Sequence, residues 1–183
     1  MNFIIGISGK PGSGKDFLAN MFVNKARHFT RISLADSIRS VVQVVTGLSM
    51  DSMRSHPEKD KPLEKYNGRS ARQLTIETAS AIESVYGLEV WSAILERRIR
   101  DQGLANIIVP DIRTLQQAQW VLDQPKGMLI RLESPSSNKP EHPIECLLDH
   151  YNFWSYVIHV SQFRQDSSAE FKKLCSTLEI ATY

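Results

Sequence analysis

Residues 3–16 read FIIGISGKPGSGKD. The apolar run 3–8 predicts a buried strand, and the i, i+3, i+4 spacing of apolar residues over 15–27 predicts a helix. The glycine-rich residues between them match the phosphate-loop pattern G-x-x-x-x-G-K-[ST] except at the last position, where Asp16 replaces Ser or Thr. This stretch therefore predicts a strand, a phosphate-binding loop and a helix in direct succession.

The loop chemistry indicates a nucleoside triphosphate, with ATP as the expected donor. Glycines allow positive φ and close approach of the backbone to a ligand. Loop N–H groups and the start of the next helix then point at the anion, and Lys15 brings positive charge to the outer phosphates. The alternative is a chance glycine-rich turn. The predicted phosphate-binding residues, called the phosphate loop below, are Gly9, Lys10, Pro11, Gly12, Ser13, Gly14, Lys15 and Asp16.

Composition suits one soluble domain over residues 1–183. The chain is 42% hydrophobic, enough for a core, and its formal net charge of +2 gives no strong attraction to nucleic acid. Cys146 and Cys175 lack metal spacing and suit thiols of a reducing cytosol. No apolar run approaches the roughly 20 residues of a membrane span, and no secretory leader is recognisable. We therefore expect a cytoplasmic protein that does not enter the membrane.

Strand and helix signals alternate along the chain, which favours an α/β fold with a parallel sheet. The expected architecture is a P-loop three-layer sandwich with about five strands and helices on both faces. Two irregular stretches, 47–69 and 133–143, suggest an acceptor-binding flap and a lid, or else plain solvated loops. The expected strands are 3–8, 29–34, 106–110, 127–132 and 156–160. The expected helices are 15–27, 35–46, 70–85, 88–101, 114–123, 143–150 and 168–178.

Two carboxylates are candidates for a Mg²⁺ site. Asp111 follows the buried run 107–109, and ligands bind at the carboxyl ends of parallel strands; Arg113 can reach the same crevice. The alternative is that Asp111 merely caps helix 114–123. Asp16 can ligate Mg²⁺ directly or through water, or its charge can simply stabilise the start of its helix.

Basic residues farther along suit an anionic acceptor, because guanidinium groups grip phosphates bidentately. Asp36 and Arg39 follow the second strand, although Asp36 could instead cap its helix. Arg69 and Arg72 stand out in the lysine-rich segment 54–72. His142 and Glu145 have poor metal spacing, and capping or surface hydrogen bonds are the better interpretation.

Several short motifs follow one another along the chain: Gly14-Lys15-Asp16, Leu34-Ala35-Asp36-Ser37-Ile38-Arg39, Ser70-Ala71-Arg72-Gln73-Leu74, Trp91, Asp111-Ile112-Arg113 and His142-Pro143-Ile144-Glu145. In this order they resemble the motifs of phage-type deoxynucleoside monophosphate kinases. The animal type of phosphomevalonate kinase is similar in layout and shares a Gly-Lys-Asp-Phe stretch with residues 14–17.

The resemblance implies a fold like that of nucleoside monophosphate kinases, and transfer of the ATP γ-phosphate to a deoxynucleoside monophosphate with Mg²⁺. It implies an acceptor-binding insert over 47–103 and a lid over 133–145, with Arg131 and Lys139 as its basic residues. Lys15, Asp16, Asp36, Asp111 and Arg113 form the implied catalytic set. The acceptor-binding residues that the resemblance implies are Asp36, Arg39, Arg72, Asp111 and Arg113, and Arg69 joins them because of its charge.

Other functions stay open at this point. A kinase acting on a hydroxyl, such as 5-hydroxymethyluracil in phage DNA, would use Asp36 or Asp111 as a base and would bind DNA in a salt-dependent way. A second small phosphorylated metabolite is another possible acceptor. A non-catalytic nucleotide switch is the third reading. The oligomeric state is undetermined, a homodimer being one option.

Overall fold

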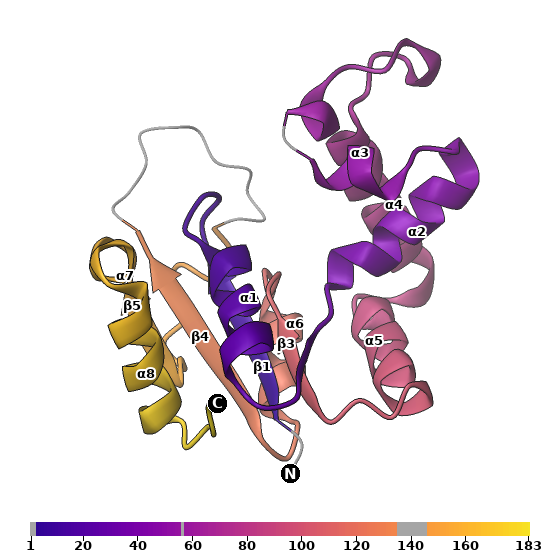
Figure 1. The fold of residues 1–183 in the computed structure, drawn as a ribbon. Coiled ribbons are helices and arrows are strands. Elements are labelled where there is room, and N and C mark those ends of the chain that lie inside the picture. Colours follow the sequence, from indigo (N-terminus) through magenta and orange to yellow (C-terminus); the bar gives the residue numbers. More distant parts are fainter. Residues whose placement is uncertain (1–2, 56, 135–145) are drawn as a thin grey trace. The chain divides into compact units, whose positions relative to one another are not determined.

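The computed structural model describes residues 3–55, 57–134 and 146–183 (Figure 1). The chain divides into two compact units. The sheet unit comprises Met1–Ile32 and Ile99–Tyr183, and the helical unit comprises Ser33–Arg98.

A parallel five-stranded sheet organises the sheet unit, in the order β2-β3-β1-β4-β5. β1 is central, and Gly6 pairs with Val109 of β3 on one side and with Leu129 of β4 on the other. The carboxyl end of β1 therefore opens between two neighbouring strands. The strands are β1 (Ile4–Gly9), β2 (Phe29–Arg31), β3 (Asn106–Val109), β4 (Gly127–Glu133) and β5 (Tyr156–His159).

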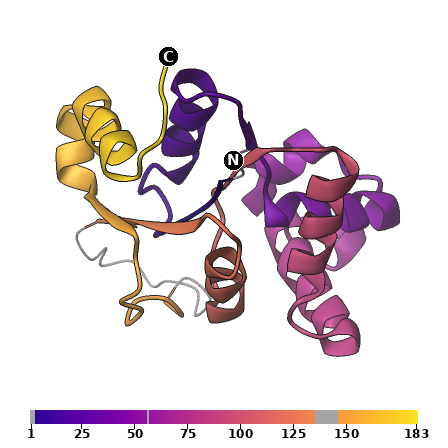
Figure 2. The same ribbon diagram turned by 90° about the horizontal axis from the view of Figure 1, so that it is seen from below.

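Helices cover both faces of this sheet (Figure 2). Ile5 and Ile7 point to one face and pack in a core with residues of the helices there. Gly6 points to the other face, where a Cβ atom would lie 2.8 Å from Ile112 Cγ1 and 3.1 Å from Val121 Cγ2. The first face carries α1 (Lys15–Lys25) and α8 (Ser167–Thr177), the second carries α6 (Leu115–Leu122), and α7 (Val160–Gln165) follows β5.

The helical unit has a small core of its own. Val42, Met53 and Ala71 are buried together, with Leu63 and Leu74 among the partly buried residues packed against them. Serine caps begin two of its helices, and Ser70 forms a capping box with Gln73. Its elements are α2 (Leu34–Thr46), α3 (Met50–Arg54), the 3₁₀ turns η1 (Glu58–Asp60) and η2 (Glu64–Tyr66), α4 (Ala71–Tyr86) and α5 (Val90–Asp101), whose last residues belong to the sheet unit.

The predicted fold class is confirmed, and most element bounds agree within two residues. The second strand is shorter than expected, because β2 ends at Arg31 and α2 begins at Leu34. The stretch 47–69 holds α3 and two 3₁₀ turns rather than irregular loop alone. The predicted helix 143–150 is wrong over 146–150, which form turns, and 143–145 lie outside the described residues.

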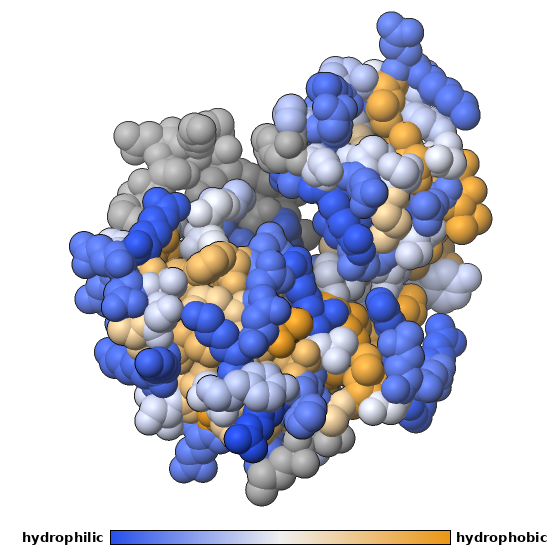
Figure 3. Space-filling model, viewed as in Figure 1, coloured by the Kyte–Doolittle hydropathy of each residue, from blue (hydrophilic) through white to orange (hydrophobic). Residues whose placement is uncertain are grey.

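Apolar residues also reach the surface. Val44 and Val45 of α2 are 86% and 77% exposed, and hydrophobic residues are visible over that part of the helical unit (Figure 3). Through the described parts of the chain, the helices are too short or too polar to cross a bilayer.

Candidate functional site

The phosphate loop joins β1 to α1 in the backbone conformation that its glycines permit. Gly9, Gly12 and Gly14 have φ of +154°, +75° and +96°. A Cβ atom at Gly9 would lie 2.8 Å from the carbonyl oxygen of Leu132 and 2.8 Å from Ser13 Oγ. Both positive φ and close packing therefore require glycine at this position.

The start of α1 suits an anion. Its N-cap, Gly14, adopts the left-handed conformation and offers no side-chain cap to the first-turn amides. Ser13 Oγ is buried and lacks a hydrogen-bond partner among the described residues, so the loop holds a polar group that a ligand or water can satisfy. These features fit the phosphates of a nucleotide.

Lys15 points back along the loop. Its Nζ donates to the carbonyl oxygens of Gly9 at 2.5 Å and Lys10 at 2.9 Å. The ammonium thus lies against the concave loop, where the phosphates of a bound nucleotide would supply stronger, negatively charged acceptors.

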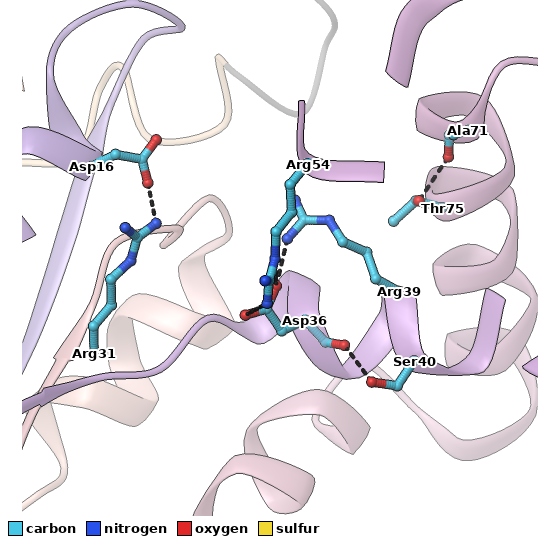
Figure 4. A network of polar contacts seen from close by, with 8 residues as sticks. All are labelled: Asp16, Arg31, Asp36, Arg39, Ser40, Arg54, Ala71 and Thr75. Atoms are coloured by element: carbon cyan, nitrogen blue, oxygen red, sulfur yellow. Dashed lines mark hydrogen bonds and ion pairs between the residues drawn. The ribbon is translucent and has the colours of Figure 1, made fainter. Parts of the chain in front are cut away.

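Asp16 lies in the first turn of α1 and forms an ion pair with Arg31 of β2 (Figure 4). Its side chain is 76% exposed. Arg31 also donates to Asn20 Oδ1 at 3.1 Å. The carboxylate is therefore accessible to Mg²⁺ from solvent. Its negative charge also interacts favourably with the positive, N-terminal end of the α1 dipole. Its role as a metal ligand stays a prediction.

A partly buried ion-pair network connects the loop to the segment before β5. Asp149 accepts from Lys10 Nζ at 2.6 Å and from Arg131 Nη2 at 2.8 Å. Arg131 also donates to Ser8 Oγ at 3.0 Å, and its guanidinium lies 5.4 Å from the centre of the Trp154 ring. Burial alone would raise the pKa of Asp149, but the hydrogen bonds from Lys10 and Arg131 outweigh it and lower that pKa.

This network includes Arg131, one of the two predicted lid residues. Arg131 is a buried residue of β4, with 10% of its side chain exposed. Arg131 is therefore paired with Asp149, which lies in the segment before β5. Lys139, His142 and Glu145, with most of the predicted lid 133–145, lie outside the described residues.

Asp111 and Arg113 follow β3 at the carboxyl edge of the sheet. Both are half-buried, and both take part in interactions. Thr114 caps α6 in a capping box with Gln117, whose Oε1 also accepts from the Arg113 backbone N–H at 2.8 Å. The alternative that Asp111 is the helix cap is therefore excluded.

In the helical unit, Asp36 binds two guanidinium groups (Figure 4). Its Oδ1 accepts from Arg39 Nη1 at 2.7 Å, and Arg54 donates to Oδ1 and Oδ2 at 3.1 and 2.8 Å. Burial alone would raise the pKa of Asp36, but Arg54 and Arg39 outweigh it and lower the pKa. Asp36 lies in the first turn of α2, whose N-cap is Ser33, so the capping alternative does not hold for it.

The other predicted acceptor arginines pair with acids in the same unit. Arg69 Nε lies 2.7 Å from Glu77 Oε2, and Arg72 Nε lies 2.6 Å from Asp60 Oδ1. All four side chains are a third or more exposed. Such pairs exchange readily with solvent and with a competing anion.

Two residues of the loop environment escaped the sequence reasoning. Asp149 was not predicted as a partner of the loop, because no spacing in the sequence links it to Lys10. Arg164 of α7 donates to the carbonyl oxygen of Gly12 at 3.1 Å, and nothing in the pattern around it marked that contact. The one sequence feature that could have indicated this contact is the position of a basic residue shortly after the last strand.

Metal-ligand clusters are not found: across residues 3–55, 57–134 and 146–183, no three His, Cys, Asp or Glu side chains gather closely enough to hold an ion. Mg²⁺ in phosphate-transfer sites is commonly held by one or two carboxylates together with the phosphates themselves. Asp16 and Asp111 remain the predicted ligands.

Comparisons with known proteins give distant structural likenesses. No protein-family model and no curated protein matches the sequence. The tunicamycin resistance protein of Deinococcus radiodurans is similar over 100% of this chain and 98% of its own, at 11% identity and a TM-score of 0.46. A sugar kinase from a Janibacter species is similar over 99% and 96%, at 16% identity and a TM-score of 0.45. These TM-scores are too low for either likeness to bear on the activity of this chain.

Proposed function

We propose that this chain is an ATP-dependent phosphotransferase that transfers the γ-phosphate to a deoxynucleoside monophosphate. The observation that carries the proposal is the phosphate loop at the carboxyl end of β1, because its positive-φ glycines, uncapped helix start and Lys15 turned back to the Gly9 carbonyl together suit an anion. The acceptor class rests on the family resemblance of the later motifs and on the arginines of the helical unit.

The residues of the loop would act by positioning and charge. Loop amides and Lys15 would hold the phosphate chain in line with the acceptor and stabilise the charge that develops during transfer. Asp16 and Asp111 would hold Mg²⁺, which supplies charge neutralisation between the outer phosphates. The acceptor phosphate is already anionic, so no general base is needed.

The helical unit would supply the acceptor site. Asp36 holds Arg39 and Arg54 as a fixed pair of guanidinium groups, a donor arrangement that suits a phosphate monoester. Arg69 and Arg72 would add positive charge nearby in the same unit. The lowered pKa of Asp36 supports a positioning role, because a carboxylate held by two arginines is a weak base.

A hydroxyl acceptor, including a hydroxymethylated base in DNA, is the second candidate. It would require a carboxylate base, and Asp111 is favoured over Asp36 for that role. Thr114 takes the helix cap that would otherwise have occupied Asp111.

The test is a panel of acceptors with ATP and Mg²⁺. We expect turnover with at least one deoxynucleoside monophosphate, and none with phosphomevalonate or with duplex DNA carrying 5-hydroxymethyluracil. Lys15→Ala should lower kcat/KM by at least about a hundredfold, since it removes charge stabilisation from the transferring group. Lys25→Ala, at the other end of α1, is the matched control and should keep wild-type activity. Turnover on DNA alone would overturn the acceptor assignment, and an active Lys15→Ala enzyme would overturn the site.

A further inference from the structure

The short helix α7 brings an arginine to the phosphate loop. Arg164 Nη2 donates to the Gly12 carbonyl oxygen at 3.1 Å, across 152 positions of sequence. Gly12 lies in the middle of the loop, and open space surrounds the position that a Cβ atom would occupy there. The guanidinium is therefore in direct contact with the segment whose amides form the anion site.

Packing beneath Arg164 fixes its approach. The preceding residue, Phe163, is buried. Its ring lies 3.7 Å from the position of a Cβ atom on Gly14, and its centroid is 5.8 Å from that of Phe17 in α1. Phe163 thus packs α7 against the loop end of α1. This packing restrains the backbone of the neighbouring Arg164 and keeps its side chain close to the loop.

The charge around Arg164 differs from that around two other arginines of the sheet unit. Arg31 pairs with Asp16, and Arg131 pairs with Asp149. Arg164 forms no ion pair with any acid in the described residues, and its recorded partner is a neutral carbonyl. A guanidinium has five N–H donors, so one weak contact leaves most of its hydrogen-bonding capacity and its whole charge for a ligand.

We propose that Arg164 binds the phosphate chain of the donor nucleotide at the outer side of the phosphate loop. The inference rests on the proposed nucleotide binding at residues 9–16 and adds a cation from beyond the loop. Negatively charged phosphate oxygens are much stronger acceptors for a guanidinium than a peptide carbonyl. On binding, Arg164 exchanges or shares its Gly12 contact with a phosphate oxygen.

A purely structural role makes a different prediction. If Arg164 only connected α7 to the loop, its replacement would lower the stability of the protein and would not selectively weaken the binding of charged ligands. If Arg164 contacted the base, its replacement would not change the affinity for a ligand that has no nucleoside. Inorganic tripolyphosphate separates these roles, because it has the charge of the donor and no base or sugar.

The experiment measures dissociation constants for ATP and for tripolyphosphate by titration calorimetry, with thermal unfolding recorded for each variant. Arg164→Gln should lower the affinity for both ligands about tenfold, which corresponds to the loss of roughly one charge-assisted hydrogen bond. Arg164→Lys should keep part of the affinity, because it preserves the charge. Affinity in Arg164→Gln should also depend less on salt than in the wild type. Arg27→Gln is the control, since Arg27 is exposed and follows the far end of α1.

Each result decides between the hypotheses. Wild-type protein that binds neither ligand overturns the proposed function itself. Wild-type binding that Lys15→Ala abolishes and Arg164→Gln leaves unchanged overturns this inference alone. Loss of ATP affinity with full tripolyphosphate affinity overturns the phosphate contact in favour of the nucleoside. Parallel loss for both ligands, with unchanged unfolding temperature, supports it.

Discussion

Asp36 shows how one carboxylate organises part of the helical unit. It joins α2 to α3 through Arg54 and also pairs with Arg39 within α2, and its side chain is 23% exposed. Because its folded pKa is lowered, the stabilisation is present above the pKa of the unfolded chain and is lost as pH falls through the folded value.

Asp36→Asn should lower the free energy of unfolding by about 1.5–3 kcal/mol at pH 7. The difference from wild type should begin to shrink as pH falls below about 4, because the carboxyl of the unfolded chain then takes up a proton while the folded one, with its lowered pKa, stays charged. Urea unfolding at pH 7, 5 and 3.5 measures it. Glu58→Gln breaks the exposed pair with Lys61 and should cost less than about 1 kcal/mol. A penalty of equal size at all three pH values would contradict the pairing.

Sequence reasoning at this scale succeeded where chemistry is local. The spacing of Gly9, Gly12 and Gly14 predicts the loop because the conformation depends on these residues themselves. Asp149 and Arg164 are different, since their partners lie 139 and 152 positions away. No single-sequence pattern encodes such contacts, which follow from the way β4, β5 and α7 pack.

At the scale of elements, α6 depends on its first turn. Thr114 Oγ1 accepts from the Gln117 backbone N–H at 3.2 Å, and the Gln117 side chain accepts in return from the Thr114 N–H at 3.3 Å. Two otherwise unpaired amides are satisfied in this way.

Thr114→Ala should therefore destabilise the protein by about 1 kcal/mol. Thr177→Ala is the control, because Thr177 ends α8 and its hydroxyl bonds back to the Lys173 carbonyl; it should change stability by less than about 0.5 kcal/mol. Equilibrium denaturation of both variants measures the difference. Equal effects would mean that the cap does not stabilise α6.

Elements were predictable in proportion to their length and burial. The runs 107–109 and 128–130 are apolar throughout and lie inside strands between other strands, so the strand prediction was right. α7 has six residues and η1 and η2 have three each, too few for helical periodicity to emerge. The helix predicted for 143–150 is absent over 146–150, where turn bonds such as the one from the Asp149 N–H to the Cys146 carbonyl oxygen, at 3.0 Å, replace helical ones.

At the scale of the whole molecule, two units with separate cores share one chain. The chain begins in the sheet unit, forms the helical unit and then re-enters the sheet unit. The core of the sheet unit therefore combines residues from both ends of the sequence. Phe22 of α1 packs against Phe29 of β2 and Phe171 of α8, with ring centroids 5.2 and 5.0 Å apart. Opening this core requires α8 to leave the sheet.

The two cysteines report on that core. Cys146 is exposed, and Cys175 of α8 is buried in it. Burial raises the pKa of the Cys175 thiol to about 11. The thiolate is the reactive form, so at pH 8 Cys175 is both covered and protonated. We expect a thiol-specific colorimetric reagent to label one cysteine per native chain rapidly, and two after unfolding in guanidinium chloride. Cys146→Ser should remove the rapid phase, and the remaining slow reaction should track opening of the sheet unit. Rapid labelling of native Cys146→Ser protein would show that α8 is not packed against the sheet as described.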